Sequence, residues 1–298
     1  MKTLIEVLNS GTEFLTKYGT AEPRATMQHL MAHVLQCNRT SLYLQFDKQI
    51  TEEQLIPLRE LLKRRVAGEP LQHLLGSTEF FRREFLTDAR ALIPRPETEE
   101  LIEYTLNRLP KQRPLRILDM GTGSGIIGIT LGLELKDQIS EVVLADISDQ
   151  ALSLALENAI RLGCKVSTRQ TDLFSDLYET VSSTGEEDAE SEGEISRVPM
   201  QFDVIMANLP YIKDDEKLDD DVLQDPHTAL FGGPLGWEII DRFLAQARNH
   251  LTEDGLIALE IGYDQSEIVS QMMYGYGYNY IEVLKDMCGI ARFPIAYK

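Results

Sequence analysis

Three glycines spaced two residues apart follow a short apolar run in the segment 117–125, ILDMGTGSG. Because glycine has no Cβ, such a turn bends sharply and lets the backbone come into contact with a nucleotide-like ligand. The turn alone does not separate a dinucleotide from S-adenosylmethionine, since both are held by the first strand-to-helix turn of an α/β sheet. We therefore predict a cofactor site formed by Gly121, Thr122, Gly123, Ser124 and Gly125.

Acidic side chains follow two further predicted strands. Asp146 ends the apolar run 142–145, where a carboxylate can accept hydrogen bonds from both hydroxyls of a ribose. Asp146 is alternatively the N-cap of the next helix, because Ser148 after it is also polar. Asp172 and Leu173 lie where an adenine would contact the sheet. The carboxylate of Asp172 can accept a hydrogen bond from the adenine amino group, and the side chain of Leu173 can cover the ring. All three are predicted to bind the cofactor.

The segment 207–211, ANLPY, follows another predicted strand and brings together a carboxamide, a main-chain carbonyl and an aromatic ring. An amide nitrogen is a poor nucleophile because its lone pair is delocalised. The side-chain oxygen of Asn208 and the carbonyl of Leu209 can accept both N–H bonds of a planar amide or exocyclic amine and aim its nitrogen at a methyl donor. A plain turn is the alternative interpretation. Beside the glycine turn, however, we predict a catalytic role for Asn208, Pro210 and Tyr211.

Short apolar runs alternate with helical patterns from residue 115 onward. Such alternation is typical of a parallel sheet covered by helices on both faces, with functional residues at the carboxyl ends of the strands. We therefore predict an α/β fold with a doubly wound, mainly parallel sheet. The predicted strands are 116–120, 141–145, 202–207 and 255–261, and the predicted helices are 126–135, 150–162 and 237–250.

A separate helical domain is predicted ahead of this sheet. Apolar residues recur every three or four positions between residues 3 and 65, which indicates a small bundle, and we place the end of this domain at residue 76. Residues 77–94 are predicted to be a β-hairpin linker, because the aromatic, β-branched and charged residues there have no helical period. The main domain spans 95–298 and begins with a helix at the segment Pro94-Arg95-Pro96.

An acidic segment at about 179–198 interrupts the α/β pattern. It holds seven acidic residues against the single Arg197, and it is rich in Ser and Gly. We predict a flexible insertion at the surface. A tolerated loop expansion is the simpler interpretation, and a regulatory or partner-binding role is the alternative.

Composition limits the partners and the compartment. The formal net charge is −19, from 48 acidic against 29 basic residues, so the average surface repels phosphate and does not favour nucleic acid. The three cysteines are scattered, and His29 and His33 lie one helical turn apart without a further ligand at metal-binding spacing. Neither a disulfide nor a metal site is therefore predicted. Without a secretory signal or an apolar run of membrane-spanning length, the chain is predicted to be cytoplasmic.

These motifs together resemble the HemK/PrmC family of protein-(glutamine-N5) methyltransferases, which modify peptide-chain release factors. The resemblance runs nearly from end to end, through the segments 69–76 (EPLQHLLG), 94–99 (PRPETE), the glycine turn, the ANLPY segment and 284–292. It implies a class I methyltransferase fold, S-adenosylmethionine as cofactor and a release factor as protein partner. It implies no direct nucleic-acid partner and no membrane.

The resemblance also implies residue roles. Asn208 joins the glycine turn, Asp146 and Leu173 in binding the cofactor. The residues that hold the glutamine amide of the release factor's Gly-Gly-Gln motif are Asn208, Leu209, Pro210 and Tyr211, and Arg95 and Glu97 are expected near the same pocket as substrate-binding residues. The sequence departs from the family at Leu209, where a proline is usual. Because that position acts through its carbonyl, leucine should keep the hydrogen bond while fixing the loop less firmly.

Two other functions stay open at this point. The segment Asn-Leu-Pro-Tyr also resembles that of ribosomal-RNA adenine dimethyltransferases. An adenine N6 methyltransferase acting on RNA or DNA is therefore the first alternative, and it requires a basic groove. The second is a non-enzymatic scaffold that keeps the cofactor fold and binds partners through the helical bundle and the acidic segment.

Overall fold

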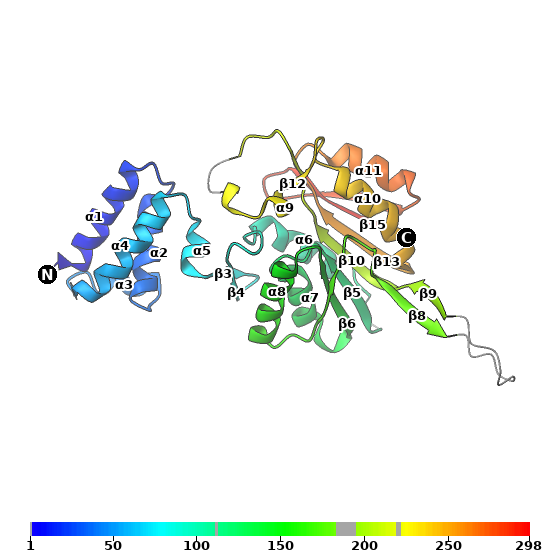
Figure 1. Cartoon of the computed structure of the whole chain (residues 1–298), viewed down its shortest axis with the longest axis horizontal. Helices are drawn as coiled ribbons and strands as arrows, with labels where there is room; N and C mark the ends of the chain where they lie inside the picture. Colours follow the sequence, from blue (N-terminus) through cyan, green and yellow to red (C-terminus); the bar gives the residue numbers. More distant parts are fainter. Residues whose placement is uncertain (1, 111–112, 183–194, 219–221) are drawn as a thin grey trace. The chain divides into compact units, whose positions relative to one another are not determined.

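The computed structural model describes residues 2–110, 113–182, 195–218 and 222–298, and the chain forms two compact units (Figure 1). The first unit contains the residues up to 78, residues 87–89 and the described part of 218–225. The second contains the other described residues. No sequence pattern had indicated that residues 87–89 and the described residues of 218–225 belong with the N-terminal helices.

The first unit is a helical bundle, as predicted for the N-terminal region. Two of its helices begin with a capping box, in which Thr3 and Thr51 each accept a hydrogen bond from the backbone N–H three residues further on. The apolar faces enclose a core that includes Leu8, Met27 and Leu30. The elements of this unit are α1 (Leu4–Lys17), α2 (Pro23–Val34), α3 (Arg39–Tyr43), α4 (Glu52–Val66), α5 (Leu71–Leu75), the short antiparallel strands β1 (Lys2–Thr3) and β2 (Gln49–Ile50), and a 3₁₀ turn at Val222–Gln224.

The second unit is built on a seven-stranded sheet with the order β14-β15-β13-β10-β5-β6-β7. The strands from β13 to β7 are parallel, whereas β15 is antiparallel to both of its neighbours. The predicted α/β class and mainly parallel sheet are thus confirmed. The strands are β5 (Leu115–Met120), β6 (Ile139–Asp146), β7 (Ser167–Gln170), β10 (Phe202–Asn208), β13 (Leu251–Glu260), β14 (Asn279–Lys285) and β15 (Ala291–Tyr297).

Helices cover both faces of this sheet because alternate residues of each strand point to opposite faces. In β10, Val204 and Met206 belong to the apolar core beneath α6, α7 and α8, whereas Ile205 and Ala207 belong to the core beneath α10 and α11. The helices are α6 (Pro96–Leu106), α7 (Ile126–Leu135), α8 (Asp149–Leu162), α10 (Glu238–Ala247) and α11 (Ser266–Gly275), with 3₁₀ turns at Lys136–Gln138 and Arg248–His250. Within the described ranges, no helix has the length and apolar character needed to cross a bilayer.

Three strands of the sheet were not given bounds from the sequence, although a strand end was predicted at residues 171–174, directly after β7. The strands β7 and β14 form the two edges, and their side chains are mostly exposed or only partly buried. An edge strand needs few apolar residues, so its sequence lacks the apolar run that identified the central strands. The third strand, β15, contains Pro294 within its apolar run, which argues against a strand in the sequence alone.

Short strand pairs flank the main sheet. The predicted hairpin is β3 (Ser77–Phe80) and β4 (Arg83–Leu86), joined by Phe81 and Arg82 with φ of 48° and 60°. The strands β8 (Tyr178–Ser182) and β9 (Ile195–Pro199) pair antiparallel, so the two ends of the acidic segment are strands and differ from the flexible loop that we expected. Residues 183–194 of that prediction lie outside the described residues. The parallel pair β11 (Ile212–Lys213) and β12 (Phe231–Gly233) brackets α9 (His227–Leu230).

Gly128 is expected to be required for the packing of α7 on the sheet. A Cβ added at this buried residue would overlap Leu144 Cδ2 and lie 3.0 Å from Asp119 Cβ. Overpacking of this kind costs about 1–3 kcal/mol, which exceeds the gain of about 1 kcal/mol in helix propensity. We therefore expect Gly128→Ala to lower the free energy of unfolding in urea. Gly275→Ala is the control, because no atom lies within 4 Å of the added Cβ in α11; equal stability of the two variants would contradict this account.

Candidate active site

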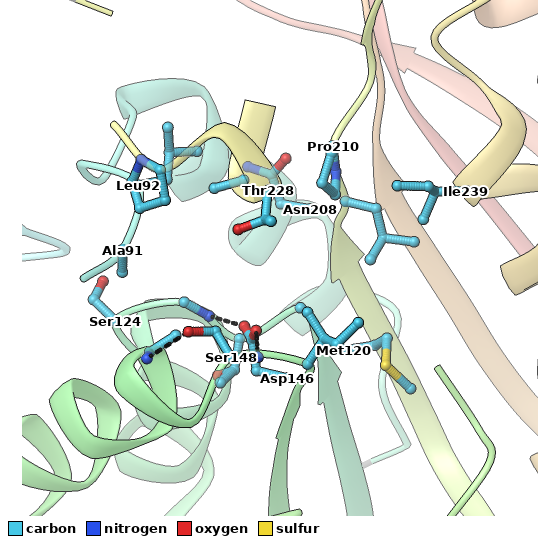
Figure 2. A pocket seen from close by; sticks show the side chains of 18 of the residues that line it. Ala91, Leu92, Met120, Ser124, Asp146, Ser148, Asn208, Pro210, Thr228 and Ile239 are labelled. Atoms are coloured by element: carbon cyan, nitrogen blue, oxygen red, sulfur yellow. Dashed lines mark hydrogen bonds between the residues drawn. The ribbon is translucent and has the colours of Figure 1, made fainter. Parts of the chain in front are cut away.

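A cavity of about 350 Å³ lies at the carboxyl ends of β5, β6 and β10 in the second unit (Figure 2). Its volume is in the range of small-molecule binding sites. Met120, Asp146 and Asn208 each end one of these strands, and all three line the cavity. In an open α/β sheet this edge binds ligands, next to the point at which the strand order reverses.

The predicted glycine turn forms one wall of the cavity. Gly121, Gly123 and Gly125 have φ of 68°, 54° and 86°, a left-handed region that favours glycine. The backbone N–H groups of Gly121 and Thr122 donate to the carbonyl of Ala145, at 2.8 and 3.0 Å, which holds the turn against β6. Residues 121–124 line the cavity, whereas Gly125 does not and instead is the N-cap of α7.

Asp146 accepts hydrogen bonds from the backbone on both sides of its carboxylate. Gly123 N–H donates to Oδ2 at 3.0 Å, and Ser148 N–H donates to Oδ1 at 2.9 Å. Burial raises the pKa of Asp146, and these backbone hydrogen bonds partly oppose the rise. The N-cap of α8 is Ser148, whose hydroxyl accepts from Ala151 N–H at 3.2 Å, so the alternative interpretation of Asp146 as the cap is wrong.

Asp119 is a fully buried carboxylate that the sequence reasoning missed. Its Oδ2 accepts from Thr122 Oγ1 at 2.6 Å and from Gly128 N–H at 2.8 Å, and it thereby links the glycine turn to α7. Burial raises the pKa of Asp119 to about 6, against the effect of these two hydrogen bonds. A charged residue inside an otherwise apolar strand, two positions before the first glycine, was the available signal.

The predicted adenine-side residues also line the cavity. Asp172 is half exposed and forms an ion pair with Arg242 of α10 at 2.8 Å, and Arg242 lines the same cavity. Leu173 is buried with φ of 52°. For a bulky residue this conformation is strained, and such strain is typical of ligand-binding segments.

The ANLPY segment contributes the opposite wall. Asn208, Leu209 and Pro210 line the cavity, and in Figure 2 Asn208 and Pro210 lie across it from Asp146 and Ser148. A Cβ on Gly121 would lie 3.0 Å from Leu209 Cδ2, so the glycine turn and this segment are in contact. Arg95, the residue before α6, lines the cavity as well.

Two of the predicted substrate-binding residues do not line the cavity. Tyr211 packs against the core beneath α10 and α11, and its carbonyl accepts from Gln265 Nε2 at 2.9 Å. Burial, with the nearby Glu260 carboxylate, raises the pKa of the Tyr211 phenol above its usual range, so the phenol stays neutral. Glu97 lies in the first turn of α6 and also does not reach the cavity wall.

Further lining residues were not predicted from the sequence. Many of them come from the loop before α6 and from the segment around α9, which lie far apart in the chain, namely Arg90, Ala91, Leu92, Ile93, Pro226, His227, Thr228, Ala229 and Phe231. Thr98 of α6 lines the cavity as well. The rings of His227 and Phe231 lie 4.3 Å apart. Nothing in the described part of the chain groups three or more His, Cys, Asp or Glu side chains as a metal site.

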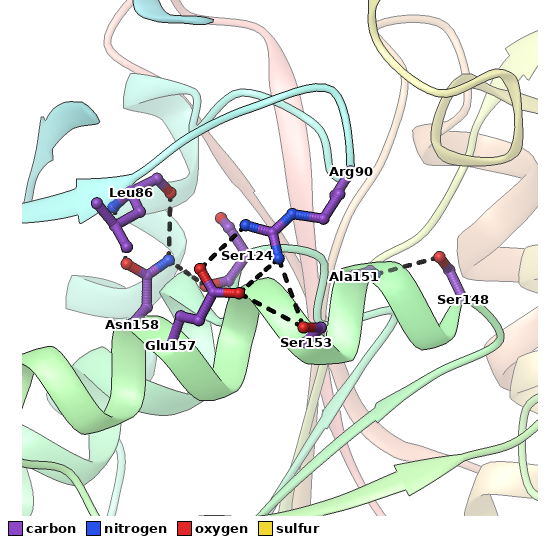
Figure 3. Close-up of polar contacts among 8 residues, drawn as sticks. All are labelled: Leu86, Arg90, Ser124, Ser148, Ala151, Ser153, Glu157 and Asn158. Atoms are coloured by element: carbon purple, nitrogen blue, oxygen red, sulfur yellow. Dashed lines mark hydrogen bonds and ion pairs between the residues drawn. The ribbon is translucent and has the colours of Figure 1, made fainter. Parts of the chain in front are cut away.

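Asn158 of α8 joins the glycine turn to the end of β4 (Figure 3). This fully buried carboxamide accepts from Leu86 N–H at 2.7 Å and donates to the carbonyls of Leu86 and Ser124, at 3.2 and 3.0 Å. The adjacent Glu157 pairs with Arg90 at 2.6 Å. The helix therefore holds both the turn and the loop that follows β4, and both line the cavity.

Comparisons with known proteins identify the family of this chain. The family model for the PrmC N-terminal domain matches residues 6–76, and the model for the methyltransferase small domain matches residues 102–184. The α/β sheet and the cavity at its carboxyl edge are thus those of a methyltransferase. The release factor glutamine methyltransferase of Koribacter versatilis is 35% identical over 299 residues, covering 99% of each chain.

Two further relatives extend this finding. The release factor glutamine methyltransferase of Bacillus anthracis is 34% identical and covers 98% of each chain. That of Escherichia coli is 37% identical over 89% of this chain and 88% of its own. The chain belongs to the release factor glutamine methyltransferase family, which confirms the resemblance seen in the sequence.

Replacing Asn158 is expected to destabilise the second unit. Asn158→Ala leaves the N–H of Leu86 and the carbonyls of Leu86 and Ser124 without their partner inside the core, and an unsatisfied buried polar group costs about 1–3 kcal/mol. The measurement is the free energy of unfolding in urea. Ser153→Ala is the matched control, because Ser153 lies exposed on the same helix. If both variants unfold at the same urea concentration, the Asn158 contacts do not hold the turn.

Proposed function

We propose that this chain transfers a methyl group from S-adenosylmethionine to the side-chain amide nitrogen (N5) of the glutamine in the Gly-Gly-Gln motif of a peptide-chain release factor. The observation that carries the proposal is the placement of Asn208 and Leu209 on the same cavity as the glycine turn and Asp146. Membership of the release factor glutamine methyltransferase family supports the choice of substrate. The cytoplasmic location remains a prediction of the sequence.

The residues of the cavity fit the cofactor. At Gly121 the backbone itself forms part of the cavity wall. A side chain at this position would come into tight contact with Leu209. The Asp146 carboxylate lines the cavity and retains acceptor capacity for ribose hydroxyls beyond its two backbone donors. Leu173 offers an apolar surface for the adenine, beside the Asp172 carboxylate. When bound, S-adenosylmethionine supplies a methyl group whose bond to sulfur breaks as the bond to nitrogen forms, while the electron pair stays on sulfur and the nitrogen releases one proton.

The role of Asn208 and Leu209 is to orient the glutamine amide. The side-chain oxygen of Asn208 and the carbonyl of Leu209 would accept its two N–H bonds, which holds the planar group in one orientation. Acceptors positioned in advance also stabilise the positive charge that develops on the nitrogen as it is methylated. Pro210 would restrict the backbone after the Leu209 carbonyl, and Tyr211 would support this segment from the core side.

Asn208→Ala is expected to lower the rate of methyl transfer by about 100-fold or more, because a positioned acceptor is lost at the reacting group. The measurement is mass spectrometry of a release factor incubated with the variant and S-adenosylmethionine, which detects a methyl group on the Gly-Gly-Gln glutamine. Asn249→Ala, an exposed asparagine that does not line the cavity, is the control.

The same assay, repeated with RNA and DNA as substrates and combined with a binding measurement for S-adenosylmethionine, separates the alternatives. An active Asn208→Ala variant would refute the role of this residue. Methylation of adenine in RNA or DNA, with an unmodified release factor, would instead favour the adenine N6 methyltransferase. The absence of any methyl transfer, together with no affinity for S-adenosylmethionine, would favour the scaffold.

Asp146→Ala is expected to weaken the binding of S-adenosylmethionine by about 10- to 100-fold, since hydrogen bonds to a charged group contribute about 1.5–3 kcal/mol. Isothermal titration calorimetry on the purified chain measures the dissociation constant. Asp149→Ala removes the same charge from the exposed first turn of α8 and is expected to leave the affinity unchanged. Equal affinities of the two variants would show that Asp146 does not contribute to binding of the cofactor.

A further inference from the structure

Three polar side chains from separate elements meet at the cavity wall, where Asn208 and Thr98 line the cavity and Glu260 does not. Asn208 ends β10 and lies opposite Glu260, the last residue of β13, in the parallel register. Thr98 comes from α6. Thr98 is 0% exposed and Glu260 is 2% exposed, so neither has solvent as a substitute partner.

When Glu260 is ionised, the hydrogen bonds among these side chains have only one consistent direction. The hydroxyl of Thr98 donates to Glu260 Oε2 at 2.6 Å, a short distance typical of a hydroxyl bound to a carboxylate. A threonine hydroxyl has a single proton, so its oxygen can then only accept. The group at 3.3 Å from it must be the donor, and this is Nδ2 of Asn208.

The opposite amide orientation would be unfavourable. If the Asn208 carboxamide were rotated by 180°, its oxygen would face the Thr98 oxygen without a proton between them. In a buried site two acceptors facing each other lose a hydrogen bond without any compensation by water. A hydrogen bond from Asn208 also lowers the pKa of Glu260, so the same NH₂ group serves both neighbours.

We propose that Glu260 and Thr98 are positioning residues that fix the orientation of the Asn208 carboxamide, so that its oxygen remains the acceptor for the N–H of the substrate amide. The proposal rests on the proposed function and adds to it the two residues that determine which way the Asn208 carboxamide faces. Neither belongs to the ANLPY segment or the glycine turn.

The protonation state of Glu260 gives the proposal a pH dependence. Burial raises the pKa of Glu260 to about 7; Glu97 raises it as well, whereas Thr98, Arg292 of β15 and Asn208 lower it. The carboxylate requires the observed direction of the hydrogen bonds. A protonated Glu260 can donate to Thr98, which frees the Thr98 proton and permits the rotated amide. Activity is therefore expected to fall as the pH drops below about 7.

The test compares isosteric variants in α6. Thr98→Val removes the hydroxyl and is expected to lower kcat/KM for a release factor by about 10- to 100-fold, while the dissociation constant of S-adenosylmethionine changes less than about twofold. Thr98→Ser restores the hydroxyl and should recover most of the activity. Thr105→Val is the matched control, because Thr105 is fully buried in the same helix and its hydroxyl has no hydrogen-bond partner among the described residues.

Glu260→Gln supplies the second readout. The variant should have reduced kcat/KM at pH 8 and should lose the fall in activity near pH 7 that the wild-type chain shows. Asp119, whose pKa burial raises to about 6, is unchanged in this variant, so any loss of activity that Asp119 causes remains. A purely structural role of Glu260 would change stability but would leave the shape of the pH profile as it is.

The outcomes distinguish this proposal from the proposed function. If the wild-type chain methylates the release factor and Asn208→Ala does not, but Thr98→Val is as active as Thr105→Val, the positioning role is wrong and the proposed function stands. An unchanged pH profile in Glu260→Gln would also overturn it. If the wild-type chain leaves the Gly-Gly-Gln glutamine unmodified, the proposed function and the positioning role are both overturned.

Discussion

In-register pairing of parallel strands is the constraint on which the site depends. Met120 lies opposite Ala145 on one side and Ala207 on the other, and Asn208 lies opposite Glu260. Parallel strands end at the same edge of a sheet, so the groups that follow them surround one cavity. A slip of one residue would turn every side chain of a strand to the other face of the sheet. The apolar cores on both faces prevent such a slip.

Buried polar groups then give this edge its detailed geometry. Asp119, Asn158, Thr98 and Glu260 are almost fully enclosed, and each forms a hydrogen bond that joins two separate elements. Apolar residues of similar size would pack there without a desolvation cost. The polar residues instead determine side-chain orientation, because a hydrogen bond specifies which atom of a side chain faces which neighbour. Burial also raises the pKa of Asp119 to about 6 and that of Glu260 to about 7.

The structure accounts for the leucine at the position where the family usually has proline. Proline would restrict the backbone through its ring. Leu209 lacks this restriction, but its side chain is buried. Its Cδ2 lies close to the glycine turn, since a Cβ added at Gly121 would be 3.0 Å from it. Packing against the glycine turn therefore limits the movement of Leu209. The carbonyl that would accept the substrate amide is therefore held by the packing of Leu209 together with the ring of Pro210 that follows it.

The sequence by itself determined the class of fold and the motifs of the site. Short apolar runs and helical patterns identified the central strands and the helices. Spaced glycines, a strand-ending carboxylate and the ANLPY segment identified residues that line one cavity. These signals are local, because each depends on residues that are neighbours in the chain. The same locality explains why the bounds of the edge strands β7 and β14, which have little apolar surface to bury, were not predicted.

Only the tertiary structure decided which distant residues meet. Thr98 and Glu260 are separated by 162 positions, and no spacing rule connects them to each other or to Asn208. The same holds for the segment around α9, which lines the cavity, and for Tyr211 and Glu97, which do not. Side-chain contacts of this kind follow from how helices pack on a sheet, and that packing is set by the whole core rather than by any one stretch of sequence.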